Sequence, residues 1–116
     1  MKASPSFQFY PSDWLRDPGL RSCSLAARGL WIDMLCFMHE AEPYGHLRLN
    51  GHDIEIAALG RMMGTPAREL LKCLAELDEA GVFDRTETGT IYSRRMVRDQ
   101  EVRIKRGQGG HLSLQN

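Results

Sequence analysis

Several features that would assign the sequence to a function class are missing from it. No apolar run reaches the roughly 18 residues that a transmembrane helix requires, so we expect no membrane partner. The N-terminal stretch MKASPSFQFYPSDW has no continuous apolar core before a cleavage site, unlike a secretory signal. With 116 residues, 42% of them hydrophobic, the chain suits one globular domain with one core, and we expect it in the cytoplasm.

Cysteine is scarce, and its pattern excludes a disulfide framework. The three cysteines, Cys23, Cys36 and Cys73, are odd in number and irregularly spaced. Cys36 and Cys73 lie within apolar helical patterns, where a free thiol normally packs as a small hydrophobic group. We therefore expect reduced, structural cysteines.

Patterns typical of enzymes are also missing. The glycines near the C-terminal end follow a charged segment instead of a strand, so they do not form a phosphate-binding loop. The four histidines have no paired ligand spacing, and His39-Glu40 with His46 is a weak zinc signal. No aspartates form an obvious acid and base pair. The sequence therefore predicts no enzyme, no metal site and no cofactor.

Neither sign of charge is in excess, because 15 basic residues balance 15 acidic ones. The distribution is nevertheless uneven. Residues 94–106 hold six basic and two acidic residues, a net charge of +4, whereas residues 1–93 hold nine basic and 13 acidic residues, a net charge of −4. Positive charge is therefore concentrated near the C-terminal end.

The chain begins with an aromatic arm, residues 1–23. We expect Ser12 to cap one short helical turn through Leu15, and Asp17-Pro18-Gly19 to break it. The arm would lie across the domain core or pack on a second subunit. Its large aromatic residues are Phe7, Phe9, Tyr10 and Trp14.

The strongest helix signal is SLAARGLWIDMLCFMHEA, residues 24–41, with Ser24 as its N-cap. Apolar residues cover more than one face of this helix. We therefore expect it to be buried on two sides, by the domain and by the arm or a partner chain. A homodimer through Trp14, Trp31 and neighbouring apolar residues is one arrangement consistent with this pattern.

Two further helices are expected around a short corner. The alternation in residues 46–49 predicts a short strand, after which Asp53 would cap a helix running to about Met63. Gly64-Thr65-Pro66 then separates two helices. Gly64 can end the first in a left-handed conformation, Thr65 can cap the next, and Pro66 suits its first position.

The helix after the corner, about 66–80, has an apolar face and ends at Gly81. That face consists of Leu70, Cys73, Leu74 and Leu77. Val82-Phe83 then opens a hairpin that turns at residues 87–89 and returns at residues 91–93. Residues 94–106 would form a basic helix or a partly ordered tail. GQGGHLSLQN is expected to be a flexible linker, as at the front of a longer protein.

The order of these elements predicts a fold class. We expect an aromatic arm at 1–23, a winged-helix domain at 24–96, and a basic helix or tail with a linker at 97–116. The fold would be mainly α with a small β-hairpin, a winged helix-turn-helix with a three-helix core and a wing.

The helix-turn-helix indicates where DNA contact is expected. Its helices must cross closely, which Gly60 would permit, and the second must present polar side chains from its first turns. Arg68 and Lys72 are four residues apart and therefore neighbours on that surface. The acidic residues after Ala75 would be repelled by phosphate. Leu71 is apolar on this helix, which leaves room for a protein partner.

The hairpin and the tail add further candidate contacts. Arginine and threonine are suitable phosphate donors, although threonine is equally common in strands and turns. The tail spaces its basic groups every three or four residues, which suits phosphate neutralisation and also a solvated helix. The candidate DNA-binding residues are Arg61, Thr65, Arg68, Lys72, Arg85, Arg94, Arg95, Arg98, Arg103, Lys105 and Arg106. The corner could also serve only for packing, or the domain could be a protein-interaction module.

Four stretches carry a resemblance: FQFYPSDWLRDPGLRSCSLAARGLWIDMLCFMHE, GHLRL, LGRMMGTPARELLKCLAELDEAGVF and IYSRRMVRDQEVRIKRGQGG. Together they resemble a prophage-encoded family of winged-helix domains, similar to the N-terminal domains of phage replication initiators and replisome organisers. The resemblance covers roughly residues 7–110. It implies double-stranded DNA and replication proteins as partners, a bacterial host cell, and no catalytic residues.

Overall fold

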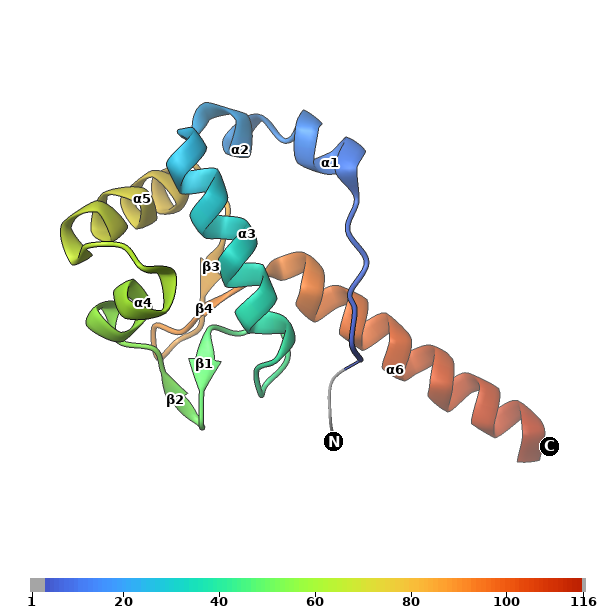
Figure 1. Cartoon of the computed structure of the whole chain (residues 1–116). Helices are drawn as coiled ribbons and strands as arrows, with labels where there is room; N and C mark the ends of the chain where they lie inside the picture. Colours follow the sequence, from blue (N-terminus) through green and yellow to red (C-terminus); the bar gives the residue numbers. More distant parts are fainter. Residues whose placement is uncertain (1–3, 116) are drawn as a thin grey trace.

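The computed structural model describes the backbone of residues 4–115 and the side chains of residues 4–107. Helices α3, α4 and α5 pack together beside two short antiparallel hairpins, and α6 projects away from them (Figure 1). The predicted mainly α chain with a small hairpin is therefore confirmed. In chain order the elements are α1 (Pro11–Arg16), α2 (Pro18–Ser22), α3 (Leu25–His39), β1 (Arg48–Leu49), β2 (His52–Asp53), α4 (Ile56–Met63), α5 (Ala67–Glu79), β3 (Asp84–Arg85), β4 (Ile91–Tyr92) and α6 (Arg94–Gln115).

The core lies between α3 and α5, because both helices carry apolar residues at helical spacing. Met34, Leu70 and Leu77 are fully buried there, and burial of a side chain of this size contributes about 1.5–3 kcal/mol. Trp31, which the sequence offered as a homodimer contact, is only 6% exposed. Its ring packs beside Phe83 of the same chain, with the two ring centroids 6.1 Å apart.

The corner between α4 and α5 is built on two glycines. Gly64 ends α4 with φ 66° and ψ 33°, the left-handed region that favours a residue without a Cβ. A Cβ on Gly60 would lie 2.8 Å from the carbonyl oxygen of Thr65, so glycine permits the close approach there. The predicted capping by Thr65 is wrong, because its hydroxyl donates to the carbonyl of Met63 and Pro66 is the N-cap of α5.

The arm contains more helix than the sequence predicted. Ser12 lies inside α1 and does not cap it. Asp17-Pro18-Gly19 ends α1 as predicted, since Asp17 is the C-cap of α1, but the same segment also starts α2. Asp17 caps this helix, since its carboxylate accepts hydrogen bonds from the N–H groups of Gly19 and Leu20 at 2.9 and 3.2 Å. Pro18 suits the first helical position, where an N–H would have no helical partner.

Asp53 does not cap a helix as predicted but lies in β2, opposite Arg48 of β1. The connecting turn has positive φ at Asn50 and Gly51, 53° and 79°, as a two-residue hairpin turn with a type I′ backbone requires. α4 begins after Glu55, which makes no side-chain capping hydrogen bond.

The predicted hairpin is formed by β3 and β4, but its first strand begins later than expected. Val82 and Phe83 precede β3, and Phe83 is buried in the core. The segment before β1 joins this hairpin, because the N–H of Leu47 donates to the carbonyl of Ile91 at 2.8 Å. His46 forms a further bridge to β4.

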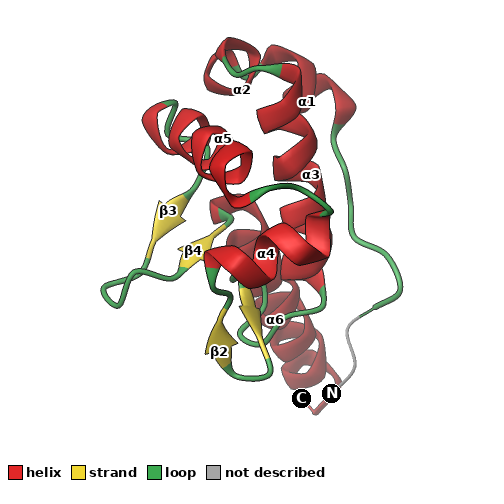
Figure 2. Ribbon diagram, turned by 60° about the vertical axis from the view of Figure 1, so that its left-hand side comes forward, coloured by secondary structure: helices red, strands yellow, loops and turns green. Residues whose placement is uncertain are grey.

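The basic segment at residues 94–106 belongs to α6. Ser93, expected at the end of the hairpin, precedes this helix, and its hydroxyl accepts from the N–H of Met96 at 3.3 Å. The helical backbone of α6 continues through Gln115, into the segment that the sequence suggested as a linker. Figures 1 and 2 both show α6 leaving the helical core.

All three cysteines are free. Cys23 is buried and Cys73 is half-buried, but Cys36 is exposed. The prediction that Cys36 packs inside is wrong, because Cys36 is exposed and lies about 200° around α3 from the fully buried Met34. Among the described residues, no helix has both the length and the apolar character needed to cross a membrane.

Candidate nucleic-acid interface

The outer surface of the α4–α5 corner carries three cationic side chains. Arg68 and Lys72 are exposed on the first half of α5, and Arg61 is exposed in the last turn of α4. No ion pair found among residues 4–107 involves any of the three. The opposite face of α5 is buried through Leu70 and Leu77, so the fold directs the cations outward.

The second half of α5 is acidic, and two of its carboxylates, Glu76 and Asp78, have partners within the protein. Glu76 accepts two hydrogen bonds from Ser24, which lower the pKa of the Glu76 carboxyl below its usual range. Asp78 pairs with Arg85 of β3 at 3.3 Å. Thr65 is half-buried at the corner itself. On α4 and α5, the exposed cations therefore lie at the end of α4 and in the first half of α5, where Glu69 is also exposed.

Arg85, predicted to reach phosphate from the hairpin, lies back against the domain. Besides its pair with Asp78, it donates to the carbonyl of Gly89 at 3.4 Å, and its guanidinium lies 5.3 Å from the ring centroid of Phe83. An exposed ion pair of this kind contributes about 0–1 kcal/mol. A phosphate could therefore compete with Asp78 for this arginine.

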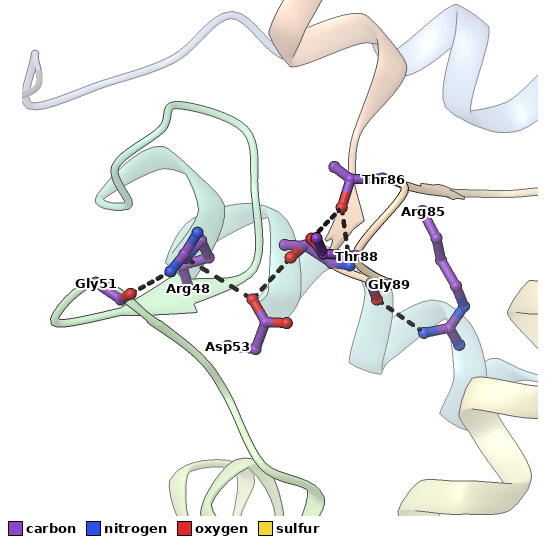
Figure 3. Close-up of polar contacts among 8 residues, drawn as sticks. Arg48, Gly51, Asp53, Arg85, Thr86, Thr88 and Gly89 are labelled. Carbon is purple, nitrogen blue, oxygen red and sulfur yellow. Dashed lines mark hydrogen bonds and ion pairs between the residues drawn. The ribbon is translucent and has the colours of Figure 1, made fainter.

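Asp53 connects the β1–β2 hairpin to the β3–β4 hairpin (Figure 3). Its carboxylate accepts from the hydroxyl of Thr90 at 2.7 Å and pairs with Arg48 at 3.7 Å. At the tip of the second hairpin, the hydroxyls of Thr86 and Thr88 lie 3.1 Å apart and share a hydrogen bond. The hairpin threonines are thus engaged within the protein.

The two arginines that start α6 are also paired. Arg94 lies 3.0 Å from a carboxylate oxygen of Asp84. Arg95 lies 2.7 Å from a carboxylate oxygen of Asp13, and its guanidinium sits 4.4 Å from the ring centroid of Tyr10. Arg95 therefore attaches the arm to α6, a contact that the sequence did not indicate.

Farther along α6 the basic side chains are exposed. Arg98, Lys105 and Arg106 belong to no ion pair among the described side chains. Arg103 places its guanidinium 5.4 Å from the ring centroid of Tyr44. This part of α6 faces the arm across a groove of about 780 Å³.

The predicted site residues therefore form two groups. The corner group consists of Arg61, Thr65, Arg68 and Lys72, with Arg85 held next to α5. The helix group lies on α6, and both views place the outer part of α6 well away from α5 (Figures 1 and 2). The structure does not bring all the predicted cations onto one surface.

Burial affects the thiols near the core. It raises the pKa of Cys23 and of Cys73, and the nearby negative charge of Glu76 acts in the same direction. Both thiols are therefore protonated at neutral pH and poorly nucleophilic. Within the described residues, no group of three or more His, Cys, Asp or Glu side chains is placed to hold a metal ion.

Comparison with protein families, with curated proteins and with solved structures found no match to this chain. The exposed cations of the corner and of α6 are the features that offer a chemical basis for function.

Proposed function

We propose that this protein is a winged-helix DNA-binding module that places the first half of α5 in the major groove of a duplex. Arg68 and Lys72 carry the proposal: they are exposed, take part in no ion pair among the described side chains, and lie one turn apart. A helix fits the major groove, which is about 12 Å wide, and arginine there can donate two hydrogen bonds to guanine. Arg61 adds a third cation beside them.

The order of the elements supports the winged-helix assignment. A helix, a short strand, the two helices of the corner and a hairpin follow one another from α3 to β4. The hydrogen bond from Leu47 to Ile91 attaches the short strand to the hairpin. The pair between Arg85 and Asp78 would hold this wing beside α5.

The acidic side chains of α5 limit the proposed contact to its N-terminal half. Glu76, Asp78 and Glu79 would be repelled by phosphate if the whole helix lay along the groove. The positive end of the helix dipole also lies at the N-terminus of α5. If Arg85 left Asp78 and paired with a phosphate of the duplex, the wing would add one contact to DNA.

We extend the proposal to replication of phage or prophage DNA within a bacterial host cell. The sequence resemblance to phage replication initiators and replisome organisers favours this extension. Replication proteins would then be partners of the same domain.

A salt series on duplex binding tests the DNA proposal. Each phosphate contact that is lost flattens the slope of log affinity against log salt by about 0.9. Replacing both Arg68→Gln and Lys72→Gln should therefore flatten the slope by up to about 1.8. The charge-matched control, Arg16→Gln with Arg21→Gln on α1 and α2, should leave it unchanged. Equal slopes for the three proteins would contradict the proposal.

A protein-interaction module is the second candidate, and Leu71 favours it. This side chain is 52% exposed on α5, one turn from Arg68. Light scattering at high concentration compares the protein with its Leu71→Gln variant. If that variant loses self-association, and loss of Arg68 and Lys72 leaves duplex affinity unchanged, the second candidate replaces the first.

A further inference from the structure

The N-terminal arm and α6, as far as Arg106, border a groove that the duplex contact does not use. Figure 1 shows the arm descending from α1 past α6. We call this the arm groove. It measures about 780 Å³, and its two walls carry Phe9, Tyr10 and Trp14 on the arm side and Arg95, Arg98 and Arg106 on α6.

We propose that the arm groove binds single-stranded nucleic acid, with unpaired bases stacked on the aromatic wall and phosphates paired with the arginines of α6. This site shares no residue with the proposed duplex contact at Arg61, Arg68 and Lys72, so either can exist without the other.

The aromatic wall presents rings to solvent. Phe9 is 44% exposed and Tyr10 is 36% exposed, although large aromatic side chains usually contribute to a core. Phe9 packs against Trp14 with ring centroids 5.4 Å apart, while Arg95 lies against the ring of Tyr10. The rings are thus supported by neighbours and still partly open.

The arm that carries these rings is attached at several points. Arg95 pairs with Asp13 at 2.7 Å, next to Trp14. At the other end of the arm, the side chain of His39 bonds to the carbonyl of Ser4, and its ring centroid lies 5.3 Å from that of Phe7. The aromatic wall is therefore held against the domain before any ligand binds.

The arginines of the basic wall favour a ligand with negative charge. The arm groove is lined by five arginines and three aspartates. Arg94 and Arg95 pair with Asp84 and Asp13, which leaves Arg98, Arg103 and Arg106 without an ion pair among the described side chains. Arg98 and Arg106 are exposed and eight residues apart on α6, which places them about 12 Å apart along the helix axis. A polyanionic strand that follows the helix would meet both.

The aromatic wall and the basic wall together favour one kind of polyanion, single-stranded nucleic acid, over a duplex or an acidic peptide. Every base has a flat π face, and guanidinium groups and aromatic rings both stack on such faces. A duplex hides these faces within its base stack. An acidic peptide supplies charge but no flat partner for Phe9 and Tyr10. The arm groove therefore suits an unpaired strand best.

Fluorescence anisotropy of a labelled oligothymidylate with the full chain tests this inference. Replacing Phe9→Leu together with Tyr10→Leu keeps apolar bulk and removes both rings, and should weaken binding about tenfold or more. Replacing Arg98→Gln together with Arg106→Gln should flatten the salt slope by about 1.4, because each phosphate contact to a single strand contributes about 0.7.

Two controls separate this site from the duplex site. The Arg68→Gln, Lys72→Gln protein should bind oligothymidylate as the parent does, and the Phe9→Leu, Tyr10→Leu protein should bind duplex as the parent does. Circular dichroism confirms that each variant is folded. Unchanged oligothymidylate affinity after loss of the rings would overturn the inference, as would equal competition by a duplex or by polyglutamate.

Discussion

Glu76 of α5 accepts two hydrogen bonds from Ser24, one from the backbone N–H at 2.7 Å and one from the hydroxyl at 2.8 Å. The same hydroxyl accepts from the N–H of Ala27 at 3.1 Å and so caps α3. One carboxylate therefore connects the start of α3 to α5. Both hydrogen bonds favour the charged carboxylate, which is why the pKa of Glu76 is lowered.

This contact predicts a pH-dependent contribution to stability. Because the pKa of Glu76 is lower in the folded than in the unfolded chain, the unfolded chain binds more protons between the two values. The contribution is complete above the unfolded pKa of about 4.3 and is lost as the pH falls through the folded value. Glu76→Gln should therefore destabilise the protein at about pH 7 and much less at about pH 3.

Urea denaturation of both proteins at the two pH values measures this difference. Glu79→Gln, on an exposed side chain of the same helix, is the matched control and should track the parent at both. An equal difference in unfolding free energy between the parent and Glu76→Gln at both pH values would show that the hydrogen bonds to Ser24 do not depend on the charge of the carboxylate.

The two faces of α5 predict responses of very different size to the same leucine-to-alanine substitution. Leu77 is fully buried, so Leu77→Ala should lower the free energy of unfolding by about 2–5 kcal/mol through lost burial and a residual cavity. Leu71 is 52% exposed, and Leu71→Ala should change it by less than about 0.5 kcal/mol. Chemical denaturation measures both, and similar losses would place Leu71 in the core or against a partner.

The close approach at the corner predicts a penalty for any side chain at Gly60. Gly60→Ala would bring a Cβ within 2.8 Å of a backbone oxygen, and such overpacking costs about 1–3 kcal/mol. Gly29→Ala is the control, because a Cβ there meets no atom within 4 Å on α3 and should stabilise the helix by about 0.5–1 kcal/mol. Thermal unfolding distinguishes the two, and equal effects would contradict the close contact.

The thiols should differ in reactivity. Cys36 is exposed, whereas Cys23 is buried with a raised pKa, and the thiolate is the species that reacts with a disulfide reagent. We expect Cys36 to react first and Cys23 about tenfold or more slowly. Stopped-flow absorbance follows the reaction, and Cys36→Ser should remove the fast phase alone. A fast phase that persists in this variant would show that another thiol is accessible.

Short-range patterns predicted the helices at the corner. The cap at Ser24, the left-handed Gly64 and the leucine face of α5 are confirmed, because each depends on residues within one or two turns. Asp53 was assigned wrongly because an aspartate can cap a helix or lie in a strand. Its partner Thr90 is 37 residues away, and no local pattern reveals that contact.

At the candidate site, too, local patterns predicted some features, and contacts between distant residues were missed. Charge and spacing correctly placed Arg68 and Lys72 on the outer face of α5, since helical geometry alone separates them from the buried leucines. The pairing of Arg85 with Asp78 and of Arg95 with Asp13 could not be predicted. Such pairs form only when separate elements pack side by side.

The sequence by itself determined the helices around Gly64, the hairpin that follows them and the surplus of positive charge near the C-terminal end, because caps, turns and periodicity act locally. Only the tertiary structure decided which cations are free and which are paired. It also decided that the arm meets α6 to form the arm groove. The reason is physical: ion pairs, ring stacking and grooves join residues distant in the chain, and their approach depends on how the whole chain packs.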